Sequence, residues 1–186
     1  SLRKINQEED PQEGVPKASL LTAAFFVASW IHIPIPPTSV HLVLNGLLGV
    51  LLGYYAVPAI LIGLFFQAVM FQHGGLTSLG VNATMMGVPA LLSFFIFRLR
   101  DRFNLQRNRV GTAIFGFLGG AAGLGLAALI AFTLLITTIP GDIDAATERA
   151  SITALILSHL TLMLIEGVFT ALVVLFLQQV KPELLE

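Results

Sequence analysis

The chain has 186 residues, of which 55% are hydrophobic, with 10 Lys and Arg, 11 Asp and Glu and a formal net charge of −1. This balance excludes a whole-protein attraction to nucleic acid, and the absence of cysteine excludes disulfides, thiolate nucleophiles and Cys-ligated metals. Three blocks, residues 18–97, 110–141 and 150–180, contain a single charged side chain, Glu166. A soluble chain needs charges on the outer faces of its helices, so these blocks predict an integral membrane protein.

A helix needs roughly 20 residues to cross a bilayer, so the first block has room for about four crossings and each later block for one. We therefore predict an all-α integral membrane fold with six transmembrane helices in residues 18–180, between a cytoplasmic N-terminal segment, residues 1–17, and a cytoplasmic tail, residues 181–186. The prolines, glycines and polar turns between the apolar runs divide the blocks further. The predicted helices cover residues 20–35, 41–55, 57–71, 82–97, 110–139 and 151–179.

The loops between the blocks indicate how the chain is oriented. Residues 98–109 contain five Arg and one Asp, which is typical of a cytoplasmic loop, whereas residues 140–150 contain three acids and one Arg. Four crossings before the basic loop then place two turns, residues 36–41 and 72–81, on the outer side of the membrane. Each of these outward turns holds a histidine.

His41 and His73 are the first candidates for a functional site. A lone histidine is more often a hydrogen-bonded interfacial residue, but two in neighbouring outward turns favour a shared site. Imidazole is the commonest protein ligand for late first-row divalent metals, and the glycines after His73 let the backbone approach a ligand closely. Because 31 residues separate the two histidines, the pair works only if the fold brings the loops together.

Glu166 is the second candidate, because a carboxylate in hydrocarbon normally faces the bundle interior and has a partner there. His159 precedes it by two helical turns, so the two side chains project from nearly the same face. A proton relay, a coupling contact and a structural hydrogen bond to Asn45, Gln67 or a backbone carbonyl all remain open. Met85 and Met86 are best interpreted as packing residues.

Two stretches of spaced glycines allow helices to approach closely. Gly46, Gly49 and Gly53 line one predicted helix, and residues 116–125 contain glycines at four-residue spacing. Packing inside the bundle and packing against a partner subunit are both compatible with this pattern. The chain has no Walker A, H-E-x-x-H or G-x-S-x-G pattern, so nucleotide hydrolysis and hydrolase chemistry have no visible apparatus.

The run FFQAVMFQHGGLTSLGVNATMMGVPA, residues 65–90, closely resembles the HGGLT-LG-N pattern of the substrate-capture (S) components of energy-coupling-factor (ECF) cobalt and nickel transporters, the CbiM/NikM family. Residues 38–53, TSVHLVLNGLLGVLLG, resemble the family's Ser-x-His segment. Residues 158–185 resemble its last helix and C-terminal tail. The resemblance covers essentially residues 20–185.

The resemblance implies a helical bundle, in the inner or plasma membrane of a prokaryote, that binds a divalent ion near its outer surface. The family's metal is held by an N-terminal Met-His-Ile start together with the histidine of the Ser-x-His segment. By position this histidine is His41 here, and Ser39 is the serine of the same segment and a supporting residue. His73 and Asn82 match the HGGLT region and, with Thr77, are expected to support the site, with direct ligation by His73 left open. Co²⁺ or Ni²⁺ is then the transported substrate, and no cofactor is expected.

The resemblance also implies partners: a transmembrane coupling (T) component, cytoplasmic ATPases, a small accessory membrane subunit and the surrounding lipid. The expected role is cobalt import for cobalamin biosynthesis, with nickel uptake as the alternative.

The chain departs from the family pattern at its start, because Ser1 opens a polar run and no Met-His start precedes it. We expect this start and the first family helix to lie upstream; otherwise other ligands replace it, with His32 as the nearest substitute, and metal affinity is weak. Two further hypotheses are an intramembrane metalloenzyme that uses His159 and Glu166 as acid/base groups, and a scaffold subunit without a ligand site.

Overall fold

The computed structural model describes residues 1–7, 10–35, 38–72, 74–139 and 144–185. Six helices, α2 to α7, dominate the described residues, and a two-stranded sheet lies between the first two of them. The elements are α1 (Leu2–Ile5), α2 (Val15–Ala28), β1 (His32–Ile35), β2 (Thr38–His41), α3 (Asn45–Leu52), η1 (Gly53–Tyr55), α4 (Ala56–Phe71), α5 (Leu79–Arg102), α6 (Arg109–Thr137), α7 (Ala145–Val180) and η2 (Pro182–Leu185).

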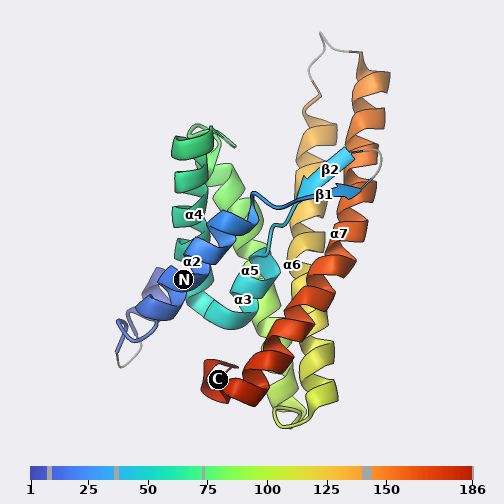
Figure 1. The fold of residues 1–186 in the computed structure, drawn as a ribbon. Helices are drawn as coiled ribbons and strands as arrows, with labels where there is room; N and C mark the ends of the chain where they lie inside the picture. The colour runs from blue at the N-terminus through green and yellow to red at the C-terminus, as the bar shows by residue number, and fades with distance from the viewer. Residues whose placement is uncertain (8–9, 36–37, 73, 140–143, 186) are drawn as a thin grey trace.

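The helices form a bundle in which the short helix α3 occupies the centre. Helices α6 and α7 run side by side as a long pair on one flank, and α2 and α4 pack together on the other (Figure 1). Helix α5 packs on α4, α3 and α6 and so joins the two flanks. Every residue of α3 is buried.

Glycines let α3 come close to its neighbours. A Cβ atom added to Gly46 would lie 2.6 Å from the carbonyl oxygen of Gly120 on α6, and one added to Gly49 would overlap the carbonyl oxygen of Ala90 on α5. Gly123 on α6 faces Gly46 in the same contact. These glycines of the two spaced stretches therefore pack against each other and against α5 inside the bundle.

The predicted membrane class is confirmed by the apolar helices. Among the described residues, four helical stretches are long and apolar enough to cross a bilayer: Asn45–Phe71, Leu79–Arg102, Arg109–Thr137 and Ala146–Val180. The first of these joins α3 and α4 through Gly53, whose φ of 55° breaks the helix between them. Helix α2 is shorter, and we count it as the further apolar helix of the bundle. The chain is a multi-pass membrane protein.

The sheet between α2 and α3 is the main difference from the predicted elements. The predicted helix over residues 20–35 ends at Ala28, and the segment predicted as helical from His41 becomes helical only at Asn45. Pro34 has no N–H to donate to a helix, and it tolerates an edge position in a two-stranded sheet. The residues between the two helices therefore form an antiparallel hairpin.

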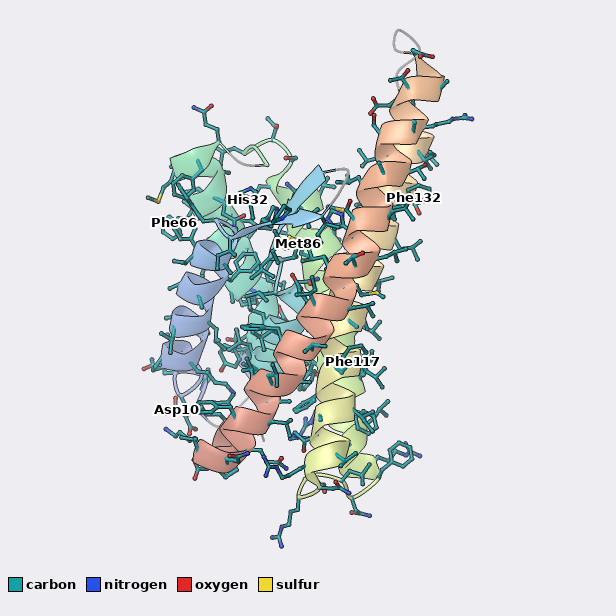
Figure 2. All side chains as sticks on the ribbon, turned by 45° about the vertical axis from the view of Figure 1, so that its right-hand side comes forward. Asp10, His32, Phe66, Met86, Phe117 and Phe132 are labelled. Atoms are coloured by element: carbon teal, nitrogen blue, oxygen red, sulfur yellow. The ribbon has the colours of Figure 1, made fainter. Side chains whose placement is uncertain are left out.

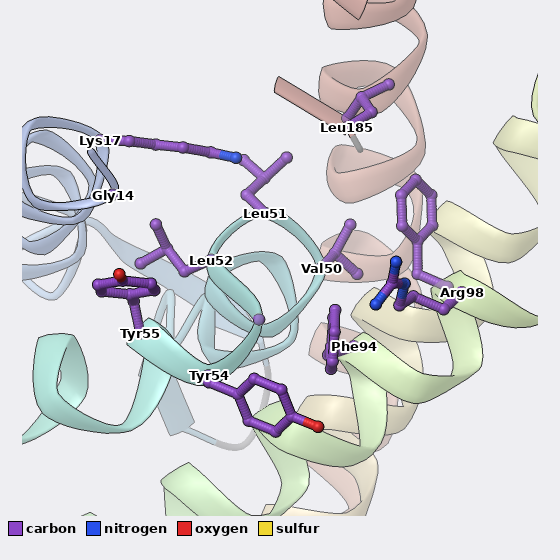
Figure 3. A pocket seen from close by; sticks show the side chains of 12 residues that line it. Gly14, Lys17, Val50, Leu51, Leu52, Tyr54, Tyr55, Phe94, Arg98 and Leu185 are labelled. Atoms are coloured by element: carbon purple, nitrogen blue, oxygen red, sulfur yellow. The ribbon is translucent and has the colours of Figure 1, made fainter. Parts of the chain in front are cut away.

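The C-terminal turn η2 closes the end of the bundle where the basic loop lies. Lys17 on α2 donates to the carbonyl oxygen of Leu184 at 2.7 Å, and Arg100 on α5 donates to that of Leu185. A cavity of about 280 Å³ lies beside this turn, and Figure 3 shows Lys17, Tyr55, Phe94 and Arg98 around it. Lys17 and the C-terminal turn thus lie at the same end as the five arginines.

Candidate metal site

The hairpin places His32 and His41 opposite each other. The two residues are Cα partners at the open end of the sheet, and their ring centroids lie 6.2 Å apart at an interplanar angle of 69°. His32 is exposed and His41 is half-buried. His32, which is labelled in Figure 2, is the substitute ligand suggested by the sequence, and the strand register makes it the cross-strand neighbour of His41.

Hydrogen bonds to the main chain determine the tautomer of both rings. Nδ1 of His41 lies 3.1 Å from the carbonyl oxygen of Leu42, and Nδ1 of His32 lies 3.0 Å from that of Trp30. A carbonyl oxygen only accepts, so each Nδ1 carries a proton, and in the neutral ring the lone pair is then on Nε2. Neutral imidazoles in this tautomer are suited to hold a divalent metal through Nε2.

A cavity of about 260 Å³ opens beside His41, between α2, α4 and α5. Its polar lining includes the side chains of Ser29, Gln67 and Asn82, and Met86 contributes a thioether. A smaller cavity of about 180 Å³, lined by His32 and Trp30, shares Ser29 and Gln67 with it. The two histidines therefore belong to adjoining cavities with a common wall.

Gln67 contributes to this wall an amide nitrogen, Nε2, that has no hydrogen-bond partner among the described residues. The residue is 4% exposed. A buried donor without an acceptor is costly, roughly 1–3 kcal/mol, so the cavity presents a donor to a water molecule or to a ligand carrying an acceptor. The sequence suggested Gln67 only as a partner for Glu166. The signal that points to it is its place as the single polar side chain of α4.

The glycine-rich loop before α5 reaches the same cavity through Gly74. Asn82 Nδ2 lies 3.4 Å from the carbonyl oxygen of Gly74 and 3.4 Å from the Ser78 hydroxyl, so it connects the loop to the first turn of α5. Gly74 and Gly75 have φ values of 76° and 67°, which favour glycine. Thr77 is exposed. His73 lies outside the described residues, as do the side chain of Ser39 and residues 36–37.

Glu166 lies at the base of the hairpin, 1% exposed. Its Oε1 accepts hydrogen bonds from the backbone N–H groups of Val43 and Leu44, and its Oε2 accepts from Leu44 at 3.0 Å. Its partners are thus backbone amides, and not Asn45, Gln67 or a carbonyl oxygen. Both oxygens are used by main-chain donors, which is the arrangement of a structural carboxylate and not of an acid/base group open to substrate.

His159 is separate from this arrangement. It is half-buried on α7, and its Nδ1 donates to the carbonyl oxygen of Leu155 in its own helix at 2.8 Å. Asn45 makes its own hydrogen bonds to the carbonyl oxygens of Met86 and Gly123. Within the described part of the chain, no three His, Asp or Glu side chains are grouped to hold a metal ion. His32 and His41 are a pair of potential ligands.

The chain resembles known metal transport proteins over nearly its whole length. Residues 1–184 match the CbiM family model, described as the cobalt uptake substrate-specific transmembrane region. A Haemophilus influenzae protein named as a metal transport protein is 34% identical over 99% of this chain and 84% of its own length. A cobalt transport protein CbiM of Sorangium cellulosum is 30% identical over 92% of this chain and 76% of its own length. The fused nickel transport protein NikMN of Rhodobacter capsulatus is 33% identical, and the chain spans 56% of that protein.

The fold is also similar to a solved structure. The crystal structure of a truncated transition metal transporter superposes with a TM-score of 0.71 at 27% sequence identity, covering 96% of this chain and 86% of that one.

Proposed function

The chain belongs to the CbiM family of cobalt and nickel transport components, and from that premise we propose that it is the membrane-embedded substrate-binding subunit of an ATP-driven ECF-type importer for divalent cobalt. The imported ion would supply cobalamin biosynthesis in a prokaryotic cell. The observation that carries the proposal is the hairpin, whose facing His32 and His41 each keep the proton on Nδ1 next to a cavity of about 260 Å³.

In this proposal His41 is the central metal ligand. Metal–imidazole nitrogen distances are about 2.0–2.1 Å, so two rings on opposite sides of one metal have centroids roughly 6 Å apart. The 6.2 Å between His32 and His41 is compatible with that arrangement. His73, Ser39, Thr77 and Asn82 are proposed to complete or support the site from the two neighbouring loops. Backbone groups or water supply the remaining coordination.

The proposed orientation places the hairpin toward the outside of the inner or plasma membrane. Support comes from the opposite end, where five arginines lie in residues 98–109 and Lys17 and Lys181 lie near the C-terminal turn. Positive residues concentrate on the cytoplasmic side of membrane proteins. ATP hydrolysis by partner ATPases, a coupling T component and a small accessory subunit belong to the same proposal.

Nickel is the second candidate substrate, because the chain is 33% identical to a nickel transport protein as well. Nickel and cobalt accept the same nitrogen ligands. Elemental analysis of the full-length protein purified from cells grown with equal cobalt and nickel tests the choice: an excess of nickel over cobalt would replace cobalt as the substrate.

Replacement of the histidines tests the site. We expect His41→Ala to lower the affinity of the full-length protein for Co²⁺ roughly 100-fold or more, because loss of a ligand should exceed the 10–100-fold effect of a supporting contact. His32→Ala and His73→Ala should each give a smaller loss. The measurements are Co²⁺ titration of the purified protein and uptake of radioactive cobalt by cells that express the whole transporter.

His159→Ala is the matched control, since it removes a histidine whose Nδ1 is bonded to its own helix. It should leave Co²⁺ affinity unchanged. Wild-type uptake by the His41→Ala, His73→Ala double variant would show that the proposed site is wrong.

A further inference from the structure

We propose that Glu166 is a positioning residue for His41, acting through the single peptide group between Leu42 and Val43. The inference rests on the proposed function, in which His41 binds the metal. It adds a role for a side chain that does not line the cavity beside His41.

Glu166 lies on the face of α7 that packs against the hairpin. Every fourth residue of this helix from 158 to 174 is buried, with Glu166 in the middle of the row. The hairpin lies against this row: Ser158 is 3.5 Å from the carbonyl oxygen of Ile35, and Leu162 packs in one cluster with Val40 and Val43. The carboxylate therefore reaches the hairpin from a rigid surface. The buried row consists of Ser158, Leu162, Glu166, Thr170 and Val174.

The Glu166 carboxylate holds the turn that precedes α3. Leu44 has a φ of 52°, in the left-handed region that a leucine rarely adopts, and it is the residue immediately before α3. In this conformation the N–H groups of Val43 and Leu44 both point at Glu166. Two consecutive N–H groups that converge in this way form an anion-binding nest. A buried carboxylate is suited to the nest, because water cannot satisfy these donors inside a membrane.

A single peptide group connects this turn to His41. The carbonyl of Leu42 and the N–H of Val43 are the two ends of one planar peptide group. The carbonyl accepts the proton of His41 Nδ1, and the N–H donates to Glu166 Oε1. The Leu42 N–H donates to the carbonyl oxygen of Ile31 at 3.2 Å, so the neighbouring peptide is held by the residue just before β1.

This connection has a geometric and an electronic consequence. The planar peptide fixes the direction of the carbonyl and thereby the rotation of the imidazole ring. An anionic carboxylate that accepts from the Val43 N–H also polarises the Leu42 carbonyl. The carbonyl becomes a stronger acceptor for the Nδ1–H of His41, and this makes Nε2 a better donor to a metal. Metal-binding histidines commonly receive this support from a carboxylate directly; here one peptide group transmits it.

The test compares two substitutions of Glu166 in the full-length protein. Glu166→Gln keeps one acceptor oxygen and removes the charge, and we expect Co²⁺ affinity to fall about tenfold. Glu166→Ala removes both acceptors, and affinity should fall toward 100-fold. In parallel, ¹⁵N NMR of histidine-labelled protein should show His41 protonated on Nδ1 in the wild type and a mixture of tautomers in Glu166→Ala.

Val174→Ala is the matched control, because Val174 belongs to the same buried row two turns farther along α7 and faces Gly116 of α6. It should lower thermal stability and leave Co²⁺ affinity and the His41 tautomer unchanged. If the Glu166→Ala variant does not fold, the Co²⁺ affinity and the His41 tautomer of the Glu166→Gln variant test the inference.

Unchanged affinity and tautomer in Glu166→Gln, or an equal loss of affinity in Val174→Ala, would overturn the inference. The His41→Ala variant distinguishes failure of this inference from failure of the proposed function. If His41→Ala abolishes Co²⁺ binding while Glu166→Gln leaves Co²⁺ affinity unchanged, the proposed metal site is retained and the positioning role of Glu166 is rejected.

Discussion

Two helices of this protein begin beside a carboxylate, in very different surroundings. The buried helix α3 follows a turn held by Glu166, whose position in the sequence is more than 120 residues away. Helix α7 begins at Asp144, which accepts a hydrogen bond from the N–H of Ala146 at 3.2 Å and is itself exposed. The first N–H groups of any helix lack partners within the helix. Water can replace Asp144, whereas inside the bundle only another part of the chain can replace Glu166.

The difference shows where tertiary structure is needed for local structure. Helix α3 has eight residues, too few for independent stability, and all of them are buried. It exists because glycines let it contact α5 and α6 and because a side chain of α7 satisfies its preceding turn. The first turns of α7 require only their own residues.

The largest expected effect comes from the contact that holds α3 against α5. Gly49→Ala places a Cβ atom on the carbonyl oxygen of Ala90, a backbone atom that cannot rotate away. Overpacking costs roughly 1–3 kcal/mol where side chains can adjust, and we expect a larger loss here. Thermal unfolding and gel filtration in detergent measure it. Gly80→Ala is the matched control, since nothing lies within 4 Å of its added Cβ; equal melting temperatures for the two variants would contradict the explanation.

A smaller effect is expected at Asn45, which joins α3 to both neighbours. Its Nδ2 donates to the carbonyl oxygens of Met86 at 3.3 Å and Gly123 at 3.0 Å. Asn45→Ala removes both bonds and also the Oδ1 that accepts from the buried Gly46 N–H at 2.9 Å, which is left without its partner, and it should cost about 1–3 kcal/mol in denaturant unfolding. Thr133→Ala, which removes an exposed hydroxyl bonded to its own helix, should change stability by less than about 0.5 kcal/mol. A neutral Asn45→Ala would mean that the packing of α3 is independent of these bonds.

The smallest effect is expected at Asp144. Hydrogen bonds from the Thr147 hydroxyl and then from the Ala146 N–H lower the pKa of the Asp144 carboxyl below its ordinary value. The cap therefore contributes at neutral pH and is lost only as the pH falls through this lowered pKa. Asp144→Ala should leave global unfolding unchanged and speed amide hydrogen exchange in the first turn of α7 at neutral pH. Identical exchange rates in the variant and the wild type would show that the Asp144 side chain does not stabilise the first turn of α7.

The membrane class and the bundle were readable from the sequence because they depend on long, local patterns. Blocks without charges predict helices in lipid, and the arginines of residues 98–109 mark the loop between α5 and α6. The hairpin was not predicted, because Pro34, Pro36 and Pro37 indicate that a helix ends here but do not indicate that strands follow. The strands also depend on pairing across the turn.

The site was partly predictable for the same reason. His41 was chosen from its place in an outward turn, and the structure adds His32 as its cross-strand neighbour, a relation that requires the register of the sheet. The partners of Glu166 were not predictable, because they are main-chain groups of a turn far away in the sequence. A buried charge indicates that a partner exists; it does not identify the partner.

The hairpin also sets limits on how the length of this chain can change during evolution. Side chains on a strand alternate between its two faces, so a single-residue insertion or deletion reverses the face of every residue beyond it. Between His41 and the N–H groups that Glu166 holds there is only Leu42, which leaves no slack to absorb such a change. Homologues should therefore vary in length between helices, for example between α6 and α7, and keep a constant spacing from His32 to Asn45 even where the intervening residues are replaced.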